Sequence, residues 1–228
     1  ALGFDSFVEL GAIRRQRNCY TPEDAASFRE QVVRDLVPLT VKIKERRAKR
    51  LGIEDFKFHD NALSFKDGSA TPQGTPEEIM AAGKKMYQEL SQETAEFIDL
   101  MFENDLFDVL AKEGKAPGGY CTSLPDYGCP FIFSNFNGTS GDVDVLTHEA
   151  GHAFADFIAS KTVPVHALRC PSMEGAETHS MSMEFLTAPW HHLFFGDLTD
   201  KYELSHAEDA LLFIPYGCLV DHFQEEVY

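Results

Sequence analysis

The sequence has no CxxC pair and no closely spaced group of cysteines. Its 228 residues contain five cysteines, which lie far apart at Cys19, Cys121, Cys129, Cys170 and Cys218. An odd number of widely spaced cysteines argues against a disulfide framework and against a zinc ribbon. This pattern is typical of proteins in a reducing compartment, so we expect a cytoplasmic location and interpret the cysteines as ordinary thiols.

The sequence also lacks a long apolar run and an excess of positive charge. No uninterrupted stretch reaches the roughly 18 apolar residues that favour a membrane-spanning helix, and the first residues do not follow the order of a secretory signal. The 20 Lys and Arg residues stand against 37 Asp and Glu residues, which gives a formal net charge of −17. A surface this acidic repels phosphate backbones and anionic lipids, so we expect no nucleic-acid partner and no membrane partner.

The composition that remains is that of an ordinary globular protein, with 43% hydrophobic and 25% charged residues. A chain of this length can bury a substantial apolar core. Residue 1 is Ala rather than Met, and the last residues, VDHFQEEVY, continue a helical pattern without a stop signal of the Gly or Pro kind. We therefore expect residues 1–228 to form a single region cut from a longer chain.

Two copies of the same start signal mark the beginnings of predicted helices. Thr21-Pro22 and Thr75-Pro76 each place a capping hydroxyl before a proline, and an acidic residue follows three positions after each threonine. Helical periodicity extends from both signals and recurs later in the chain. Helices are predicted over residues 22–50, 76–115 (with breaks near Ser91 and Asn104-Asp105), 142–160, 173–188, 190–196 and 203–227.

Little of the sequence favours β-structure. Residues 56–65 alternate enough for a strand or an extended connector, whereas residues 115–130 are rich in Gly and Pro, which marks a structured loop. One short strand is predicted over residues 131–136, and it turns at Asn137-Gly138 just before the helix of residues 142–160. We therefore expect a small sheet beside that helix.

The helix predicted over residues 142–160 carries the motif HExxH, in which His148 and His152 are four residues apart and Glu149 follows the first histidine. Residues four apart lie on the same helix face, about 6 Å from each other, so the two imidazoles can share one zinc ion. Glu149 would then face the open side of the metal, take a proton from the attacking water and deliver it to the leaving amine. The alternative is a buried helix with hydrogen-bonded histidines, but the apolar flanks and the preceding strand favour the zinc site.

A catalytic zinc needs a third protein ligand and an open fourth position. The metzincin motif is excluded, because Ala155 and Ile158 stand where it requires glycine and histidine. Glu177 and Glu184 are seven residues apart and share a face of the next predicted helix, so one can bind metal while the other supports it. Spacing alone makes Glu177 only the leading choice. The candidates on this helix are Glu174, Glu177, His179 and Glu184.

The segment KAPGGYCTSLPDYGCPFIFSNFNGTSGDVDVLTHEAGHAF, followed by GAETHSMSMEF, resembles the oligoendopeptidase F branch of the thimet oligopeptidase family of zinc peptidases. The resemblance is close from about Lys115 to Leu186 and looser over the preceding helices. In that family a glutamate about 25 residues after HExxH completes the zinc sphere. The resemblance therefore implies that Glu177 is the third ligand and that Glu184 orients a ligand histidine.

The same resemblance gives PFIFSNFNG, residues 130–138, the role of a strand edge along which an extended peptide lies. The backbone of Ser134 and Asn135 would then bind substrate, while the phenylalanines pack in the core. Members of the family also hold the developing oxyanion with tyrosine and histidine side chains from a downstream loop. No Tyr-rich loop follows the motif here, so we do not expect full catalysis from residues 1–228 alone.

Taken together, the motifs and the resemblance predict a mostly α-helical, zincin-like fold, with α+β structure around the active site and a small sheet next to the HExxH helix. The predicted function of residues 1–228, as a single catalytic region, is that of a zinc metalloendopeptidase that binds one zinc ion and hydrolyses internal bonds of short peptides. One alternative is a non-catalytic zinc- or peptide-binding fragment. The other is a zinc hydrolase that acts on something other than peptides. No oligomeric state is predicted.

Overall fold

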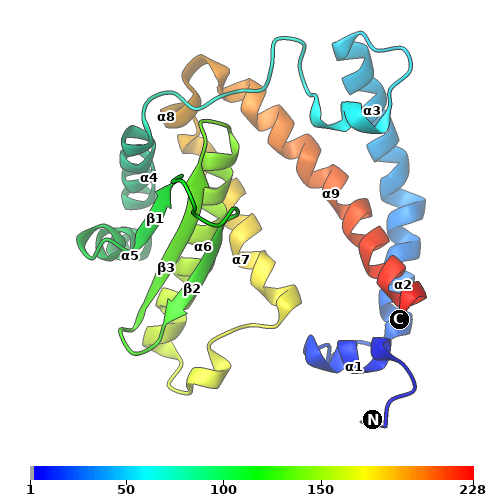
Figure 1. The fold of residues 1–228 in the computed structure, drawn as a ribbon, viewed down its shortest axis with the longest axis horizontal. Helices are drawn as coiled ribbons and strands as arrows, with labels where there is room; N and C mark the ends of the chain where they lie inside the picture. The colour runs from blue at the N-terminus through cyan, green and yellow to red at the C-terminus, as the bar shows by residue number, and fades with distance from the viewer. Residues whose placement is uncertain (1–2) are drawn as a thin grey trace. The chain divides into compact units, whose positions relative to one another are not determined.

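The computed structural model describes residues 3–228, and the chain divides into two compact units (Figure 1). The first unit joins the residues up to Ser69 with Lys201–Tyr228, and the second unit is Ala70–Asp200. This division reflects packing within the chain. The expectation that residues 1–228 act as one catalytic region stays a prediction.

Most of the described chain is helical, and its three strands form one sheet. This confirms the predicted fold class, which was mostly helical with a small sheet beside the HExxH helix. No described helix combines the length and the hydropathy that crossing a membrane requires. The helices are α1 (Phe7–Arg14), α2 (Pro22–Gln31), α3 (Val37–Leu51), α4 (Pro76–Leu90), α5 (Gln92–Glu103), α6 (Gly141–Thr162), α7 (Met173–Leu186), α8 (His192–Phe195) and α9 (Thr199–Val227), and the strands are β1 (Phe107–Leu110), β2 (Tyr120–Leu124) and β3 (Cys129–Phe136).

The two predicted start signals begin helices as expected. Thr21 accepts a hydrogen bond from the backbone of Asp24 at 3.2 Å, and Thr75 accepts one from Glu78 at 3.3 Å. In both cases the acidic side chain bonds back to the threonine backbone, which completes a capping box. The predicted helix 22–50 is present as α2 and α3, joined by a short π-helical segment ahead of Pro38. A widened turn there is consistent with proline, which lacks an N–H and crowds the preceding turn.

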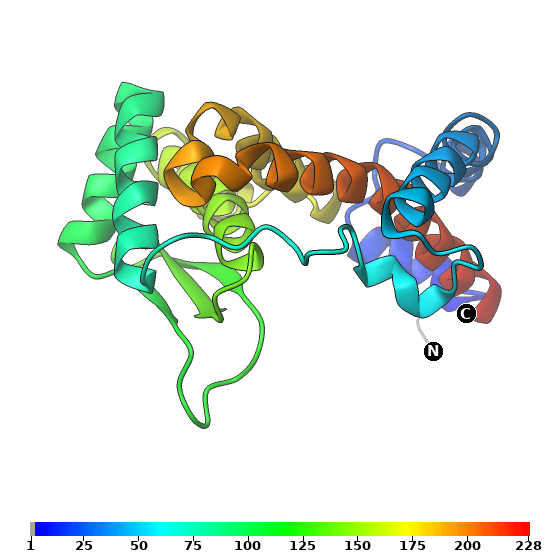
Figure 2. The ribbon, with the colours of Figure 1, turned by 90° about the horizontal axis from the view of Figure 1, so that it is seen from above.

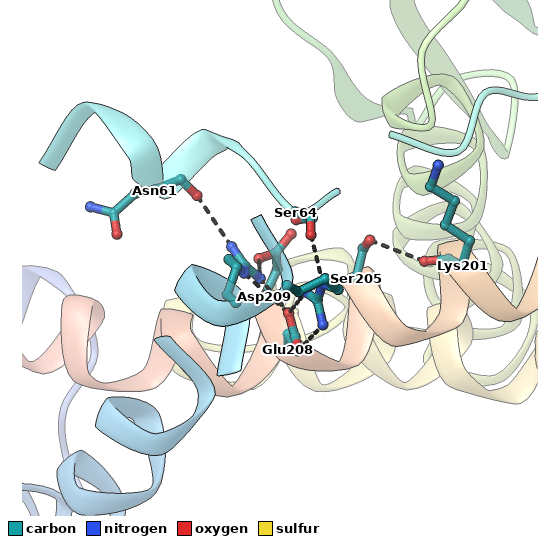
Figure 3. A network of polar contacts seen from close by, with 8 residues as sticks. Asn61, Ser64, Lys201, Ser205, Glu208 and Asp209 are labelled. Atoms are coloured by element: carbon teal, nitrogen blue, oxygen red, sulfur yellow. Dashed lines mark hydrogen bonds and ion pairs between the residues drawn. The ribbon is translucent and has the colours of Figure 1, made fainter. Parts of the chain in front are cut away.

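The first unit contains a network of buried charges between α3 and α9 (Figure 3). Arg47 is only 2% exposed, and its guanidinium donates to Glu208 at 2.9 Å and to Asp209 at 2.8 Å. Arg50 donates to the same Glu208 carboxylate at 2.9 Å and to the carbonyl of Ser64 at 2.7 Å. A buried charge is tolerated only when it is paired and hydrogen-bonded. The two helices can therefore pack together here only because these contacts form.

In the second unit, α6 packs against the sheet and also against α7 (Figure 1). The buried face of α6 is an apolar stripe whose members recur every three or four residues. Phe157 in this stripe meets Phe97 of α5, and α4 and α5 pack against each other at one side of the unit (Figure 2). Because the stripe anchors one side of α6, His148 and His152 on the other side remain partly exposed. The stripe consists of Val143, Leu146, Ala150, Ala153 and Phe157.

The sheet has the strand order β1-β3-β2, which makes β3 its central strand. β1 runs parallel to β3, with Phe107 opposite Ile132, and β2 runs antiparallel on the other side, with Cys121 opposite the same residue. The prediction that residues 130–138 provide an open strand edge is therefore wrong, because β3 has a hydrogen-bonded neighbour on each side. Among the described strands, the free edges belong to β1 and β2.

Two strands were not predicted, and the segment predicted to be a strand or an extended connector contains a short helix. β1 lies within the range predicted to be helical, just after the break at Asn104-Asp105, and β2 lies within the predicted loop 115–130. Residues 56–65 contain a 3₁₀ helix, Phe58–Ala62, instead of a strand. β1 has four residues and β2 has five, so neither is long enough to display a clear period of two.

Candidate metal centre

The two histidines of the HExxH motif lie one helical turn apart on α6. Their ring centroids are 5.0 Å apart, and their planes are nearly perpendicular, at 82°. The side chains of His148 and His152 are 29% and 23% exposed, so both imidazoles are partly covered but still reach a solvent-accessible side of the helix. The helix alone therefore brings two nitrogen ligands to one place.

The third candidate ligand comes from α7. The Oε2 atom of Glu177 lies 3.1 Å from Nε2 of His148 and 3.6 Å from Nε2 of His152. One potential ligand atom from each of the three residues lies within 4.8 Å of the others. Among the described residues, this is the one group of three or more His, Cys, Asp or Glu side chains that could hold a metal ion.

This close approach of α7 to α6 depends on a glycine. A Cβ atom built on Gly151 would stand 2.6 Å from Cα of Ser180 and 2.8 Å from the carbonyl oxygen of His179. Both of these are backbone atoms, which cannot move aside as a flexible side chain can. The glycine inside HExxH therefore lets α6 and α7 touch at His179 and Ser180, within one helical turn of Glu177.

Glu184, one of the four candidates on α7, contacts the opposite side of the His148 ring. Its Oε1 atom lies 2.6 Å from Nδ1 of His148. This hydrogen bond raises the pKa of His148, and burial acts in the opposite direction. A carboxylate acceptor at Nδ1 favours the tautomer with its proton on that nitrogen, which leaves the Nε2 lone pair facing Glu177 and available to a metal.

The electrostatic surroundings of the other two motif residues differ. Burial lowers the pKa of His152, which favours the neutral ring that binds metals. Glu149 is only 9% exposed. This burial raises the pKa of its carboxyl group, and the charge of His148 opposes the shift. A carboxylate with a raised pKa is a better proton acceptor than an exposed glutamate. The backbone of Cys121 in β2 hydrogen-bonds to this carboxylate.

The donor set and its spacing fit zinc. Two imidazole nitrogens and one carboxylate oxygen are a set found at catalytic zinc sites, with metal–ligand distances of about 2.0–2.2 Å. In a tetrahedral arrangement, such bond lengths place ligand atoms about 3.3–3.6 Å apart. The distances of 3.1 and 3.6 Å between Glu177 and the two rings lie close to this range.

The other candidates on α7 lie outside this group. Glu174 is in the first turn of the helix, where an acidic residue suits the positive end of the helix dipole. His179 lines the cavity next to His152 but is not a member of the three-residue group. Neither Gly151 nor Ser180 was predicted to have a role at the site, although Ser180 lies between Glu177 and Glu184 on the helix face that they share.

Ser134 and Asn135 lie in β3, the central strand of the sheet. Ser134 is 3% exposed, and its carbonyl accepts a hydrogen bond from Nζ of Lys115. The Asn135 side chain donates to the carbonyls of Ala116 and Gly118, which belong to the loop before β2. Their predicted role in substrate binding stays a prediction, but the contact with Lys115 already occupies the Ser134 carbonyl, which is one of the backbone groups that a peptide would need.

A cavity of about 890 Å³ adjoins the metal centre. His152 and Gly151 line one end, β2 contributes Cys121 and Ser123, and the remaining wall is largely apolar, with Leu168 at the rim 71% exposed. Burial raises the pKa of the Cys121 thiol to about 12, so this side chain stays a neutral wall group. The cavity is large enough to hold several residues of an extended peptide.

Comparison with known proteins identifies the family. The sequence matches the profile of peptidase family M3 over residues 1–210. It is 26% identical over 152 residues to an oligoendopeptidase F homolog of Lactococcus lactis subsp. lactis (strain IL1403) and 25% identical over 150 residues to the chromosomal oligoendopeptidase F of Lactococcus lactis subsp. cremoris. These matches cover 64% of this chain and 24% of each relative, so the chain spans about a quarter of their length.

Solved structures agree with this assignment. A Bacillus anthracis str. Ames protein described as oligoendopeptidase F is 50% identical and has a TM-score of 0.96, with 100% of this chain and 42% of that chain covered. PZ peptidase A, solved with an inhibitor, is 52% identical and has a TM-score of 0.95, with 40% of its chain covered. The chain described here belongs to peptidase family M3, in its oligoendopeptidase F branch.

Proposed function

We propose that this chain carries the catalytic core of a zinc metalloendopeptidase that hydrolyses internal bonds of short peptides. One zinc ion would be held by His148, His152 and Glu177, with Glu149 as the general base and Glu184 orienting His148. The observation that carries this proposal is the convergence of three ligand atoms within 4.8 Å of one another, beside a buried carboxylate. Membership of a peptidase family supports the same reaction class.

The proposed reaction assigns a part to each side chain. A zinc ion in this position would supply Lewis acidity, which lowers the pKa of the attacking water and polarises the peptide carbonyl. Glu149 accepts the proton of that water and returns it to the nitrogen of the leaving amine. The raised pKa of Glu149 suits both steps, because the group must first accept a proton and then hold it until the amine departs.

The substrate would lie along β2 rather than along β3. The N–H of Ile132 points to β1, since it donates to the carbonyl of Leu106 at 3.1 Å, so the pair formed by Ile132 and Cys121 is not hydrogen-bonded. The backbone N–H and C=O groups of Cys121 therefore face the outer edge of β2. The N–H already donates a hydrogen bond to the Glu149 carboxylate. An extended peptide can add to this edge through backbone hydrogen bonds and put its side chains into the adjoining apolar cavity.

The first alternative is a zinc- or peptide-binding fragment without catalysis. Family membership and the buried Glu149 beside the ligands give it less support, because metal binding alone does not require a base with a raised pKa. The second is a zinc hydrolase with another substrate, and the peptidase names of the relatives argue against it. We also retain the cytoplasmic setting, short peptides as partners and no nucleic-acid partner, as predicted from the cysteine pattern, the family resemblance and the net charge.

The test combines metal analysis with a base-deficient variant. The purified chain is expected to bind one zinc ion. Because this chain spans only 42% of a solved relative, cleavage of a fluorogenic peptide is best measured on a protein that spans the relative's full length. Glu149→Gln should keep the zinc and lose activity by about a hundredfold to ten-thousandfold.

Glu174→Gln provides a matched control, since it makes the same change at a residue that is neither a proposed ligand nor the proposed base. It should leave both zinc content and cleavage unchanged. A chain that binds no zinc, or a Glu149→Gln variant with unchanged cleavage, would rule out the proposed mechanism. Zinc binding without any cleavage would favour the non-catalytic fragment.

A further inference from the structure

Glu177 has the most exposed side chain of the three candidate ligands. The side chain is 55% exposed, compared with 29% and 23% for the two histidines of the same group. An exposed glutamate has several rotamers available, and most of them would point the carboxylate away from α6. A metal site formed from such a side chain therefore benefits from a contact that selects one rotamer before the metal arrives.

Ser180 makes such a contact. Its hydroxyl oxygen lies 2.7 Å from Oε2 of Glu177, the atom that faces the rings of His148 and His152. The same oxygen lies 3.2 Å from the backbone carbonyl of Glu177, which is the usual acceptor for a serine inside a helix. The hydroxyl has a single proton, and the shorter, charge-assisted bond to the carboxylate is the stronger of the two.

The position of the Ser180 hydroxyl is itself fixed. Ser180 is fully buried, and its Cα lies directly beneath Gly151, where a Cβ atom would come within 2.6 Å. The serine therefore sits at the contact point of α6 and α7, one turn after Glu177 on the same face of α7. A hydroxyl held at this point does not move with the exposed carboxylate and can serve as its anchor.

We propose that Ser180 is a positioning residue, whose hydroxyl holds the Glu177 carboxylate toward the imidazoles of His148 and His152 and so preorganises the metal site. This inference rests on the proposed function, in which Glu177 is the third ligand. Ser180 does not touch the metal or the substrate and acts through Glu177 alone. Loss of a residue that orients a metal ligand typically weakens metal affinity 10- to 100-fold, and we expect about tenfold here, because a single neutral donor is removed.

The experiment measures zinc affinity of the purified chain by competition with a chromogenic chelator. Ser180→Ala should weaken zinc binding about tenfold. Ser182→Ala is the matched control, because it makes the same change on the same helix at an exposed position outside the metal-binding group, and it should leave the affinity unchanged. Circular dichroism and the melting temperature establish that each variant is folded.

A double-mutant cycle separates positioning from a general structural effect. If Ser180 acts through Glu177, then Ser180→Ala should cause no further loss of zinc affinity in the Glu177→Ala background. Cobalt(II) can replace zinc as a probe, and its visible spectrum should change in the same direction in both single variants because both disturb the same ligand.

The possible results lead to different conclusions. If Glu177→Ala leaves zinc affinity unchanged, Glu177 is not a ligand and the proposed metal site fails. If Glu177→Ala weakens binding but Ser180→Ala does not, only the positioning role is overturned. Equal losses from Ser180→Ala with and without Glu177 would also overturn it, because the serine would then act through the packing of the helices.

Discussion

Glu184 and Ser180 contact two different members of the metal-binding group, each from α7. Glu184 lies 2.6 Å from Nδ1 of His148, and Ser180 lies 2.7 Å from the Glu177 carboxylate. The contact with Glu184 leaves Nε2 of His148 facing Glu177, and the contact with Ser180 holds Oε2 of Glu177 beside the two rings. Of the three candidate ligands, His148 and Glu177 are therefore each held by a side chain of α7.

Replacing Glu184 tests the support of His148. Glu184→Gln keeps the size of the side chain but removes the charge that fixes the proton on Nδ1, so zinc affinity at neutral pH should fall by about tenfold. Chelator competition measures this change, and Glu174→Gln on the same helix should leave the affinity as it is. An unchanged affinity in Glu184→Gln would mean that packing alone orients the ring.

At the residue scale, the sequence predicts the site residues that lie close together along the chain, but not those that depend on contacts between helices. His148, Glu149 and His152 lie within five residues, so helix geometry alone predicts their relative positions. Glu177 is 25 residues farther along, and only the family resemblance separated it from Glu174. Ser180 contributes through its hydroxyl and Gly151 through its lack of a side chain. Both depend on the contact between α6 and α7, which a local sequence pattern does not indicate.

The pairing of α6 with α7 is the element-scale feature on which the site depends. α6 carries two of the proposed ligands and the proposed base, and α7 carries the third proposed ligand and both groups that contact the ligands. The contact between Gly151 and Ser180 brings these two sets together. An increase in the helix separation would move Glu177 away from the histidines without altering any ligand.

Gly151→Ala tests this dependence. The added methyl group would meet backbone atoms at 2.6 and 2.8 Å, so α7 must shift, at a cost of about 1–3 kcal/mol in unfolding free energy. Chelator competition should also reveal weaker zinc binding, because Glu177 shifts with its helix. Gly217→Ala in α9 is the matched control: its new methyl group comes no closer than 4.0 Å to Phe213, so the better helix propensity of alanine should stabilise it or leave it neutral. Equal stability and zinc affinity in Gly151→Ala and the unchanged chain would contradict this account.

The strands show where element prediction failed. β3 has eight residues, with alternate side chains buried, and it was predicted from its apolar run. β2 is polar at several positions and is flanked by Gly and Pro, so it resembles a loop until its pairing with β3 is known. The expectation that β3 is an edge strand failed for the same reason, because strand order depends on contacts distant in sequence.

At the scale of the whole molecule, capping signals and the HExxH motif predicted much of the helical fold, while the division into two compact units was not foreseen. Arg47 illustrates why. It lies in the basic run KIKERRAKR at the end of the predicted helix 22–50, yet Arg47 is 2% exposed and pairs with an acid more than 150 residues away. Burial of a charge depends on a distant partner and leaves no signal in the local sequence.

The pairing of Arg47 with Glu208 leads to a prediction about acid stability. Burial by itself would raise the pKa of Glu208, but hydrogen bonds and charges from Arg50 and Arg47 lower it below its usual value of about 4.5 overall. A group whose pKa is lower in the folded state stabilises the fold above its unfolded pKa, and this contribution is lost as the pH falls through the folded pKa.

Glu208→Gln should therefore lower the free energy of unfolding at pH 7 by about 2 kcal/mol, because two arginines lose a charged partner. It should also flatten the decline in stability below about pH 4.5, since the titrating group is gone. Urea denaturation at pH 7, 5 and 3.5 measures both effects. Asp209→Asn is the matched control, because this carboxylate also contacts Arg47 but its side chain is 62% exposed, and its loss should cost less than about 1 kcal/mol. If the Glu208→Gln variant retains the full acid dependence, then other carboxylates, and not the charge network between α3 and α9, determine the response of this chain to acid.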